Sequence, residues 1–149
     1  MRKCPTCRQG KLEAGVTRVK RRVAGIDFAG TLPATLCGSC DEALVSAAEL
    51  GRFELAIAER LAALGVRNGE AFKFMRKALG LRAIDLAALL DVAAETVSRW
   101  ETGQPEARAF ALLGSVVTDR IAGTERTVDS LKALQSEKRR PSRVRVRAA

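Results

Sequence analysis

The stretch that decides the fold is Leu81–Gly103, which reads LRAIDLAALLDVAAETVSRWETG. Two short segments with apolar residues at helical spacing, Ala83–Leu90 and Ala94–Thr102, flank the turn at Asp91-Val92-Ala93. This layout is typical of a helix-turn-helix, in which the second helix enters a DNA major groove and the first braces it. The segment therefore predicts double-stranded DNA as the partner of this chain.

The second helix of this motif has two chemically different sides. Val97, Trp100 and Glu101 share one side, and we expect Trp100 to pack against Leu86 and Leu90 of the preceding helix. The side chains that we expect to contact DNA from this helix are Glu95, Thr96, Ser98, Arg99 and Thr102.

Arg99 is the strongest single candidate for reading sequence. Its guanidinium can donate to both the O6 and N7 acceptors of guanine, whereas Glu95 suits the amino group of cytosine. Ser98 suits a base or a phosphate. The alternative interpretation is that these residues form only the solvent-exposed face of a surface helix.

Arg76 and Glu101 have a different expected role. A helix that begins after Asn68 brings Arg76 to the end of Ala94–Thr102, and we predict that its guanidinium pairs with Glu101 and fixes the angle between the two helices. Arg76 as a phosphate ligand is the alternative.

All four cysteines lie in two Cys-x₂-Cys pairs, Cys4 with Cys7 and Cys37 with Cys40. Each pair can bring two thiolates to one ion, and two pairs complete a tetrahedral sulfur shell for Zn²⁺. Four protein ligands leave no open position for water, so we predict one structural zinc ion rather than a hydrolytic site. Iron, and a redox dithiol or disulfide, are the alternatives.

The residues between the cysteine pairs predict a small antiparallel sheet. Short extended segments are expected at Val16–Arg22, Ile26–Ala29 and Thr31–Leu36, separated by glycines, and the proline in the last segment indicates an edge position or an irregular strand. Ser46 and Glu49 then form the pattern of a capping box. A helix of about five turns should follow, with an apolar stripe of Leu50, Phe53, Ile57, Leu61 and Leu64.

The predicted fold is mainly α with a small β part. It comprises an N-terminal zinc-knuckle antiparallel sheet, a connecting helix and a C-terminal five-helix domain, whose last two helices span Glu106–Ala122 and Glu125–Leu134. We expect a zinc-binding domain at residues 1–64, a linker at 65–69, a DNA-binding domain at 70–134 and a basic, disordered tail at 135–149. Leu112 and Val116 lie off the main apolar stripe and indicate a dimer surface.

The chain is strongly basic, with a formal net charge of +9 and a pI near 10.1, which favours a polyanionic partner. The end of the chain carries six Lys and Arg residues between 138 and 147 and no acid. This segment suits a solubilising tail or a non-specific phosphate-binding arm. We expect a cytoplasmic protein that is not an enzyme, since the sequence has no signal peptide, no apolar run of membrane-spanning length, no histidine and no glycine-rich phosphate loop.

Residues 70–103 resemble the Xre/Cro repressor type of helix-turn-helix, whose pattern is similar to T-Q-x-E-L-A-x-L-L-G-V-S-x-x-T-V-S-R-W-E-x-G. The matching residues are Leu86-Ala87, Leu89-Leu90, Val92, Thr96-Val97-Ser98-Arg99-Trp100-Glu101 and Gly103. Together with the cysteine pairs, the order of parts is similar to the MqsA (YgiT-type zinc finger) antitoxin family over about the first 125 residues. That resemblance implies a zinc domain joined to an Xre-type domain that dimerises and binds an operator.

The chain departs from the repressor pattern at several positions. Arg82-Ala83 stands where the family has Thr-Gln, which removes a cap and a polar DNA contact, and Arg82 is then expected to supply a phosphate contact. Asp91 replaces a glycine at a turn that often requires positive φ, which Asp tolerates better than most residues. Ala93 replaces the serine that caps the second helix, a loss of about 1 kcal/mol.

Three functions suit this sequence. The first is a zinc-stabilised, homodimeric repressor that binds a palindromic operator through its C-terminal domain. The second, implied by the resemblance, is an antitoxin whose N-terminal part binds a toxin protein. The third is a zinc- or redox-responsive regulator.

Overall fold

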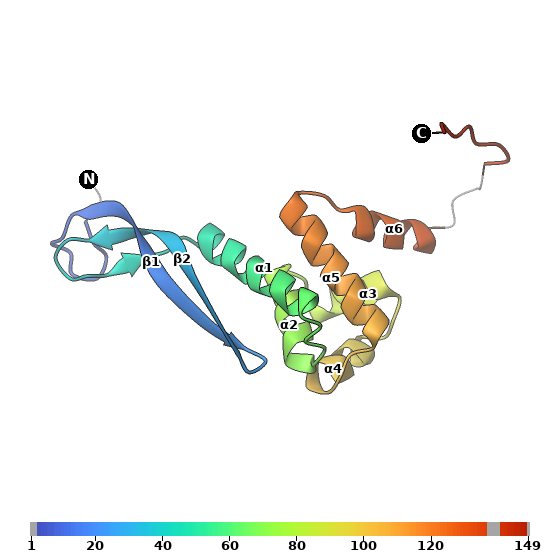
Figure 1. Cartoon of the computed structure of the whole chain (residues 1–149), viewed down its shortest axis with the longest axis horizontal. Coiled ribbons are helices and arrows are strands. Elements are labelled where there is room, and N and C mark those ends of the chain that lie inside the picture. The colour runs from blue at the N-terminus through green and yellow to red at the C-terminus, as the bar shows by residue number, and fades with distance from the viewer. Residues whose placement is uncertain (1–2, 137–140, 149) are drawn as a thin grey trace.

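The computed structural model describes residues 3–136 and 141–148. These residues form a three-stranded antiparallel sheet followed by six helices, arranged as an elongated molecule (Figure 1). The elements are β1 (Leu12–Val23), β2 (Ile26–Cys37), β3 (Ala43–Leu44), α1 (Ala47–Ala63), α2 (Gly69–Ala78), α3 (Ala83–Leu90), α4 (Ala94–Thr102), α5 (Ala107–Ala122) and α6 (Arg126–Gln135). This confirms the predicted fold class, a small sheet followed by a connecting helix and five further helices.

β1 and β2 form one long hairpin that contains all three predicted extended segments, but the strands are longer than predicted and the expected break at Gly30 is absent. Each strand has 12 residues, and their pairing is continuous from Leu12 with Cys37 to Val23 with Ile26. The glycines within the strands are positions where another side chain approaches the backbone closely, and the strands continue through them. A Cβ on Gly15 would lie 2.5 Å from Leu36, and one on Gly30 would lie 2.8 Å from the ring of Phe53 on α1.

Pro33 occupies an edge position, as predicted. β3 pairs with β2 only at Thr35 and Leu36, so β2 has one neighbour at Pro33. At the other end of the hairpin, Ala24 and Gly25 form a two-residue turn with φ of 52° and 77°. Positive φ at both central positions is the geometry of a type I′ turn, which suits the twist of the strands but is unusual for alanine.

α1 connects the sheet to the other helices and also contributes to their core. Ser46 caps it by accepting a hydrogen bond from the Glu49 amide at 3.2 Å, while the Glu49 carboxylate pairs with Arg52. Its buried residues, Ile57, Ala58 and Leu61, pack in one cluster with residues of α2 to α5. α1, which the sequence assigned to the zinc domain, therefore shares the helical core. That residues 1–64 form a separate domain stays a prediction.

The helical core is built around α2. Asn68 caps α2 by accepting from the Ala71 amide at 2.9 Å, and Phe72 and Met75 are fully buried. The ring of Trp100 on α4 meets the ring of Phe72 edge to face, with centroids 5.8 Å apart and planes at 79°. This contact anchors α4 in the protein interior.

The turn between α3 and α4 follows the sequence prediction closely, since both helices have the predicted bounds. Asp91 has φ 54° and ψ 49°, the left-handed conformation for which the repressor pattern uses glycine. Ala93 occupies the N-cap position of α4 and provides no side-chain hydrogen bond.

α5 and α6 complete the helical part. Val116, predicted to lie on a dimer surface, is instead buried in the core of the chain, so that prediction is wrong for this residue. Asp119 on α5 accepts a hydrogen bond from the amide of Thr127 at 2.7 Å, which caps the start of α6. α6 has no buried residue, and its Leu134 is largely exposed.

Part of the basic tail lies outside the described residues, namely residues 137–140 and 149. Residues 141–148 are exposed and lack regular secondary structure. None of the described helices has the length and apolar character needed to cross a membrane.

Candidate metal centre and DNA interface

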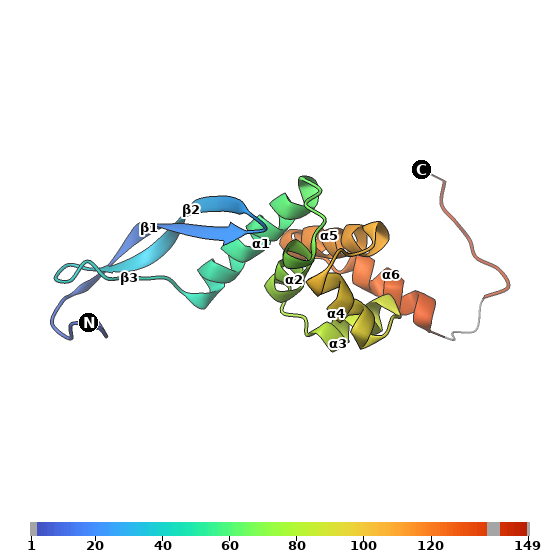
Figure 2. The ribbon, with the colours of Figure 1, turned by 90° about the horizontal axis from the view of Figure 1, so that it is seen from below.

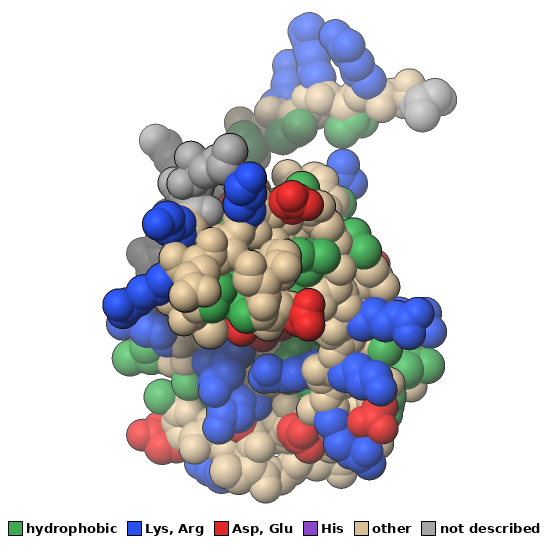
Figure 3. Space-filling model, turned by 90° about the vertical axis from the view of Figure 1, so that its left-hand side faces the viewer, with side chains coloured by type: hydrophobic (Ala, Val, Ile, Leu, Met, Phe, Trp, Pro, Cys, Tyr) green, Lys and Arg blue, Asp and Glu red, His purple; other side chains and the backbone are tan. Residues whose placement is uncertain are grey.

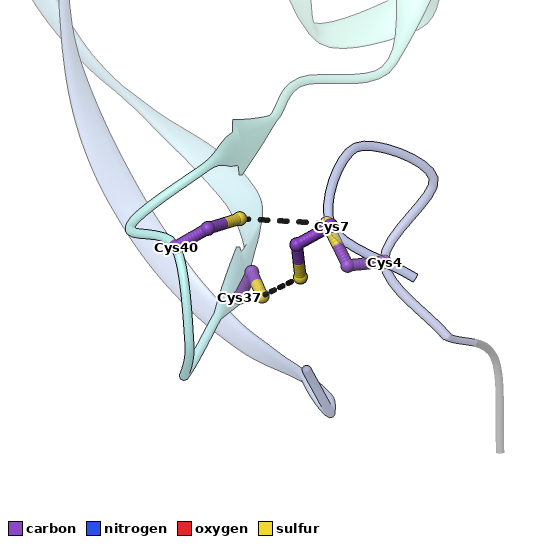
Figure 4. A group of neighbouring side chains, drawn as sticks. All are labelled: Cys4, Cys7, Cys37 and Cys40. Carbon is purple, nitrogen blue, oxygen red and sulfur yellow. Dashed lines mark hydrogen bonds between the residues drawn. The ribbon is translucent and has the colours of Figure 1, made fainter. Parts of the chain in front are cut away.

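The two cysteine pairs converge at the end of the hairpin that is far from the helical core (Figures 1 and 4). All four sulfur atoms lie within 4.8 Å of one another, and Cys4 with Cys40 and Cys7 with Cys37 are 3.7 Å apart. A tetrahedral ion with about 2.3 Å bonds to sulfur places its ligands about 3.8 Å apart. A disulfide requires about 2.05 Å between sulfurs, so the geometry fits a Cys₄ metal site and not two disulfides.

Backbone groups shape this cluster. The amide of Gly10 donates to the Cys7 sulfur at 3.3 Å, and the amide of Ser39 donates to the Cys37 sulfur at 3.4 Å. The residue after each pair, Arg8 or Asp41, has the left-handed conformation, with φ of 60° and 55°. The two knuckles therefore turn in the same way and present their sulfurs to a common point.

Gly10 is a site residue that sequence reasoning missed. A Cβ at this position would lie 2.1 Å from the Cys37 sulfur. Only the absence of a side chain lets the two knuckles approach this closely.

The thiol pKa values differ within the cluster. Hydrogen bonds from the amides of Gln9 and Gly10 lower the pKa of Cys7 to about 6. The pKa of Cys4 is also lowered, first by the amide of Cys7. The amide of Glu42 acts to lower the pKa of Cys40, but burial and the neighbouring cysteines outweigh it and raise that pKa to about 12. The neighbouring sulfurs thus disfavour a further negative charge at Cys40, and a cation held between the four sulfurs would offset that repulsion.

α4 presents an uncovered surface on the side away from the core. Val97 and Trp100 are buried, whereas Glu95, Ser98 and Arg99 are exposed. Thr102 is exposed and its hydroxyl donates to the Ser98 carbonyl at 3.0 Å, while Thr96 is half-buried. All of the residues predicted to contact DNA except Arg82 thus lie on one short helix, and the described residues leave most of that surface uncovered.

Arg82 differs from the others because its charge is already engaged. Its guanidinium donates to the Asp85 carboxylate at 2.8 and 2.9 Å, and its backbone amide donates to the same carboxylate at 3.2 Å. The hydrogen bonds from the Arg82 side chain lower the pKa of Asp85. Arg82 remains exposed at the start of α3, so a phosphate that binds there would compete with Asp85 for hydrogen bonds from the Arg82 guanidinium.

The structure brings Arg76 and Glu101 together between α2 and the end of α4. The guanidinium donates to both Glu101 oxygens, and it also donates to the Leu81 carbonyl at 2.7 Å. Only 9% of either side chain is exposed, so this ion pair is screened from water, whereas the ion pairs of Arg22, Arg52 and Arg82 are more exposed to solvent.

Gly69 is a second position that the sequence did not reveal. Its amide donates to the Gly103 carbonyl at 3.0 Å, which brings the start of α2 onto the end of α4. A Cβ here would lie 2.4 Å from the Glu101 carbonyl oxygen.

Comparison with known proteins agrees with this architecture. Residues 72–113 match the helix-turn-helix family, a segment that includes Phe72, all of α3 and α4, and the first part of α5. This match supports a helix-turn-helix domain in this part of the chain. No curated protein matches the chain.

Proposed function

We propose that this protein is a sequence-specific DNA-binding transcription regulator that acts as a repressor. The observation that supports this most directly is the face of α4 that carries Glu95, Ser98 and Arg99, which is free while Trp100 holds the opposite face in the core. A short helix held in this way can enter a major groove without rearrangement.

Each residue on this face has a role set by its chemistry. Arg99 reads guanine through two parallel hydrogen bonds, and Glu95 accepts from the amino group of cytosine. Ser98, Thr96 and Thr102 contact bases or phosphates, and Arg82 contacts a phosphate at the start of α3. Arg76 and Glu101 do not touch DNA but fix the angle at which α4 is presented.

The test is selection of duplexes from a random pool by the full-length protein, followed by binding measurements on the selected sequence. Arg99→Ala should weaken that binding by about 1–3 kcal/mol and leave binding to unrelated duplexes unchanged. Arg126→Ala on α6, also exposed, is the matched control and should have little effect. Equal weakening on every duplex would assign Arg99 to a phosphate, and a pool without enrichment would reject sequence-specific binding.

We also propose that Cys4, Cys7, Cys37 and Cys40 hold one structural Zn²⁺. When bound, the ion offsets part of the negative charge of the thiolates and cross-links the first residues of the chain to the end of the hairpin. The four thiolates leave no open position for water, so the ion supplies no hydrolytic chemistry. Metal analysis of the purified protein tests its identity, and iron instead of zinc would contradict the proposal.

The regulator is proposed to act as a homodimer whose two α4 helices meet a palindromic operator about 34 Å apart. An MqsA-like antitoxin role is its most specific form, supported by the order of parts, two cysteine pairs followed by an Xre-type domain. Sequencing the adjacent gene tests that role. A small basic neighbour whose product binds the full chain would support it, and its absence would favour a solitary repressor.

A further inference from the structure

The hairpin of β1 and β2 has two different faces. The inner face contacts the helices: Gly30 lies under Phe53 of α1, and Val23 is buried in the helical core. The outer face carries Arg18, Lys20 and Arg22 on alternate residues of β1, and all three are exposed. Because alternate residues in a strand are about 6.6 Å apart, these cations form a row along one side of the ribbon.

The residues opposite this row on β2 leave most of its charge unopposed. Arg18 pairs with Thr31 and Lys20 with Ala29 in the sheet register, so neither faces an acid. Asp27 is the acid opposite Arg22, and it accepts two hydrogen bonds from that arginine at 3.0 Å. In the described part of the chain, Arg18 and Lys20 form no ion pair. Lys and Arg side chains also gather across the middle of the surface seen from the hairpin end (Figure 3).

The hairpin is held beside the helix-turn-helix. Arg21 points to the inner side and lies over the ring of Phe74 on α2, 5.8 Å from its centroid, and α2 in turn packs on α4. The tip of the hairpin and α4 both lie at the lower edge of Figure 1, and the view from below shows the hairpin crossing in front of α1 (Figure 2). The hairpin tip and α4 therefore lie toward the same edge of the molecule in this view.

We propose that the outer face of the hairpin, defined by Arg18, Lys20 and Arg22, binds the phosphate backbone of duplex DNA beside the site that α4 reads. This inference rests on the proposed function. The row from Arg18 to Arg22 covers four residue steps, about 13 Å, a distance over which a duplex presents several phosphates. The contact lengthens the DNA footprint and adds affinity that does not depend on sequence.

The chemistry of this face favours duplex DNA over single strands. Proteins that bind single strands stack the bases on aromatic side chains. Beside its cations the outer face offers Val16, Pro33, Thr31 and Ala29, and the phenylalanines of this region, Phe28 and Phe53, lie on the inner side. A row of cations without a stacking platform suits a regular backbone of phosphates.

The test compares full-length protein with the variant Arg18→Gln/Lys20→Gln on two duplexes of one mixed sequence, about 20 and about 40 base pairs long. Wild type should bind the longer duplex more tightly per site. The variant should lose this advantage, with about tenfold weaker binding and a salt-dependence slope smaller by about 1.8, because each neutralised phosphate contributes about 0.9 to that slope. Arg126→Gln/Lys132→Gln on α6 removes the same charge far from the hairpin and should keep the wild-type slope.

A charge-preserving variant and a competitor complete the test. Arg18→Lys/Lys20→Arg should bind like wild type, because phosphate contacts require charge more than shape. The proposal is overturned if the hairpin variant and the α6 variant behave alike, or if polyglutamate competes as well as duplex at equal charge. It fails separately from the proposed function, since Arg99→Ala then still weakens binding to the selected sequence. Loss of the Arg99 effect with an intact hairpin effect would reject only sequence reading by α4.

Discussion

The cysteine end and the helical part of this molecule are stabilised by different interactions. Near the cysteine cluster, the buried side chains are small or few: Cys4, Cys37, Leu32 and Ala34. The helical part buries a continuous cluster that includes Phe72, Met75, Leu86, Val97, Leu113 and Val117. The first region therefore depends on metal ligation for its stability, whereas the second depends on apolar burial.

Loss of a cysteine ligand should separate these two regions most sharply. Cys37→Ser removes one thiolate from a site whose zinc affinity is worth about 10–16 kcal/mol in small zinc domains. We expect amide hydrogen exchange to become fast in residues 3–15 and 34–45, while α2 to α5 stay protected. Ser39→Ala, between the second pair of cysteines, is the control and should change little. Unfolding of the helices in the cysteine variant would show that the two regions are not independent.

Breaking the buried ion pair should have the largest effect within the helical part. Glu101→Ala leaves the Arg76 guanidinium screened from water without its carboxylate, and the free energy of unfolding should fall by about 3–5 kcal/mol. The double variant Arg76→Met/Glu101→Leu removes both charges and should recover most of that loss. Urea unfolding measures both variants. Equal losses in the two would mean that the pair itself, and not the isolated charge, sets the stability.

Two helical glycines allow a matched comparison of a crowded and an open position. Gly69→Ala directs a Cβ at the backbone of Trp100 and Glu101, which cannot move without shifting α4, and should cost about 1–3 kcal/mol. Gly51→Ala on α1 meets no atom within 4 Å and should raise stability by about 0.5–1 kcal/mol, since alanine favours helix. Thermal unfolding distinguishes the two, and a stabilising Gly69→Ala would contradict the close approach of α2 to α4.

The smallest expected effect concerns the tip of the hairpin. Ala24 adopts a left-handed conformation that costs a residue with a Cβ about 1–2 kcal/mol, so Ala24→Gly should raise stability by up to about 1 kcal/mol. Ala29→Gly, in the extended part of β2, should lower it because glycine there gains no conformational relief. Similar changes in both variants would argue against the turn geometry.

Much of the fold follows from local sequence signals. Asn68 and Ser46 predict helix starts because their side chains can satisfy free amides, and both form the expected hydrogen bonds. The spacing of apolar residues gives the bounds of α3 and α4, and the spacing of the cysteines indicates one metal cluster. These features depend on residues that are close in sequence or on a strongly constrained ligand geometry.

The remaining features depend on contacts between distant segments. Gly15 and Gly30 suggest strand breaks until Leu36 and Phe53 are seen to fill the space that they leave. In the sequence, Val116 suggests a dimer surface because it lies off the main apolar stripe. Its burial in the core depends on tertiary packing that the sequence pattern does not reveal. The row of Arg18 and Lys20 has no sequence signature beyond alternation, and its importance depends on where the hairpin docks.

The most direct measurement of the central claim is an NMR titration of the full-length protein with the duplex that it selects. The account predicts that the largest changes in amide chemical shift occur in Glu95–Thr102 of α4, while the amide signals of Ile57 and Leu61 in the core do not shift. Shifts confined to residues outside α4, with Glu95–Thr102 unperturbed at saturation, would contradict the claim that the free face of this helix reads DNA.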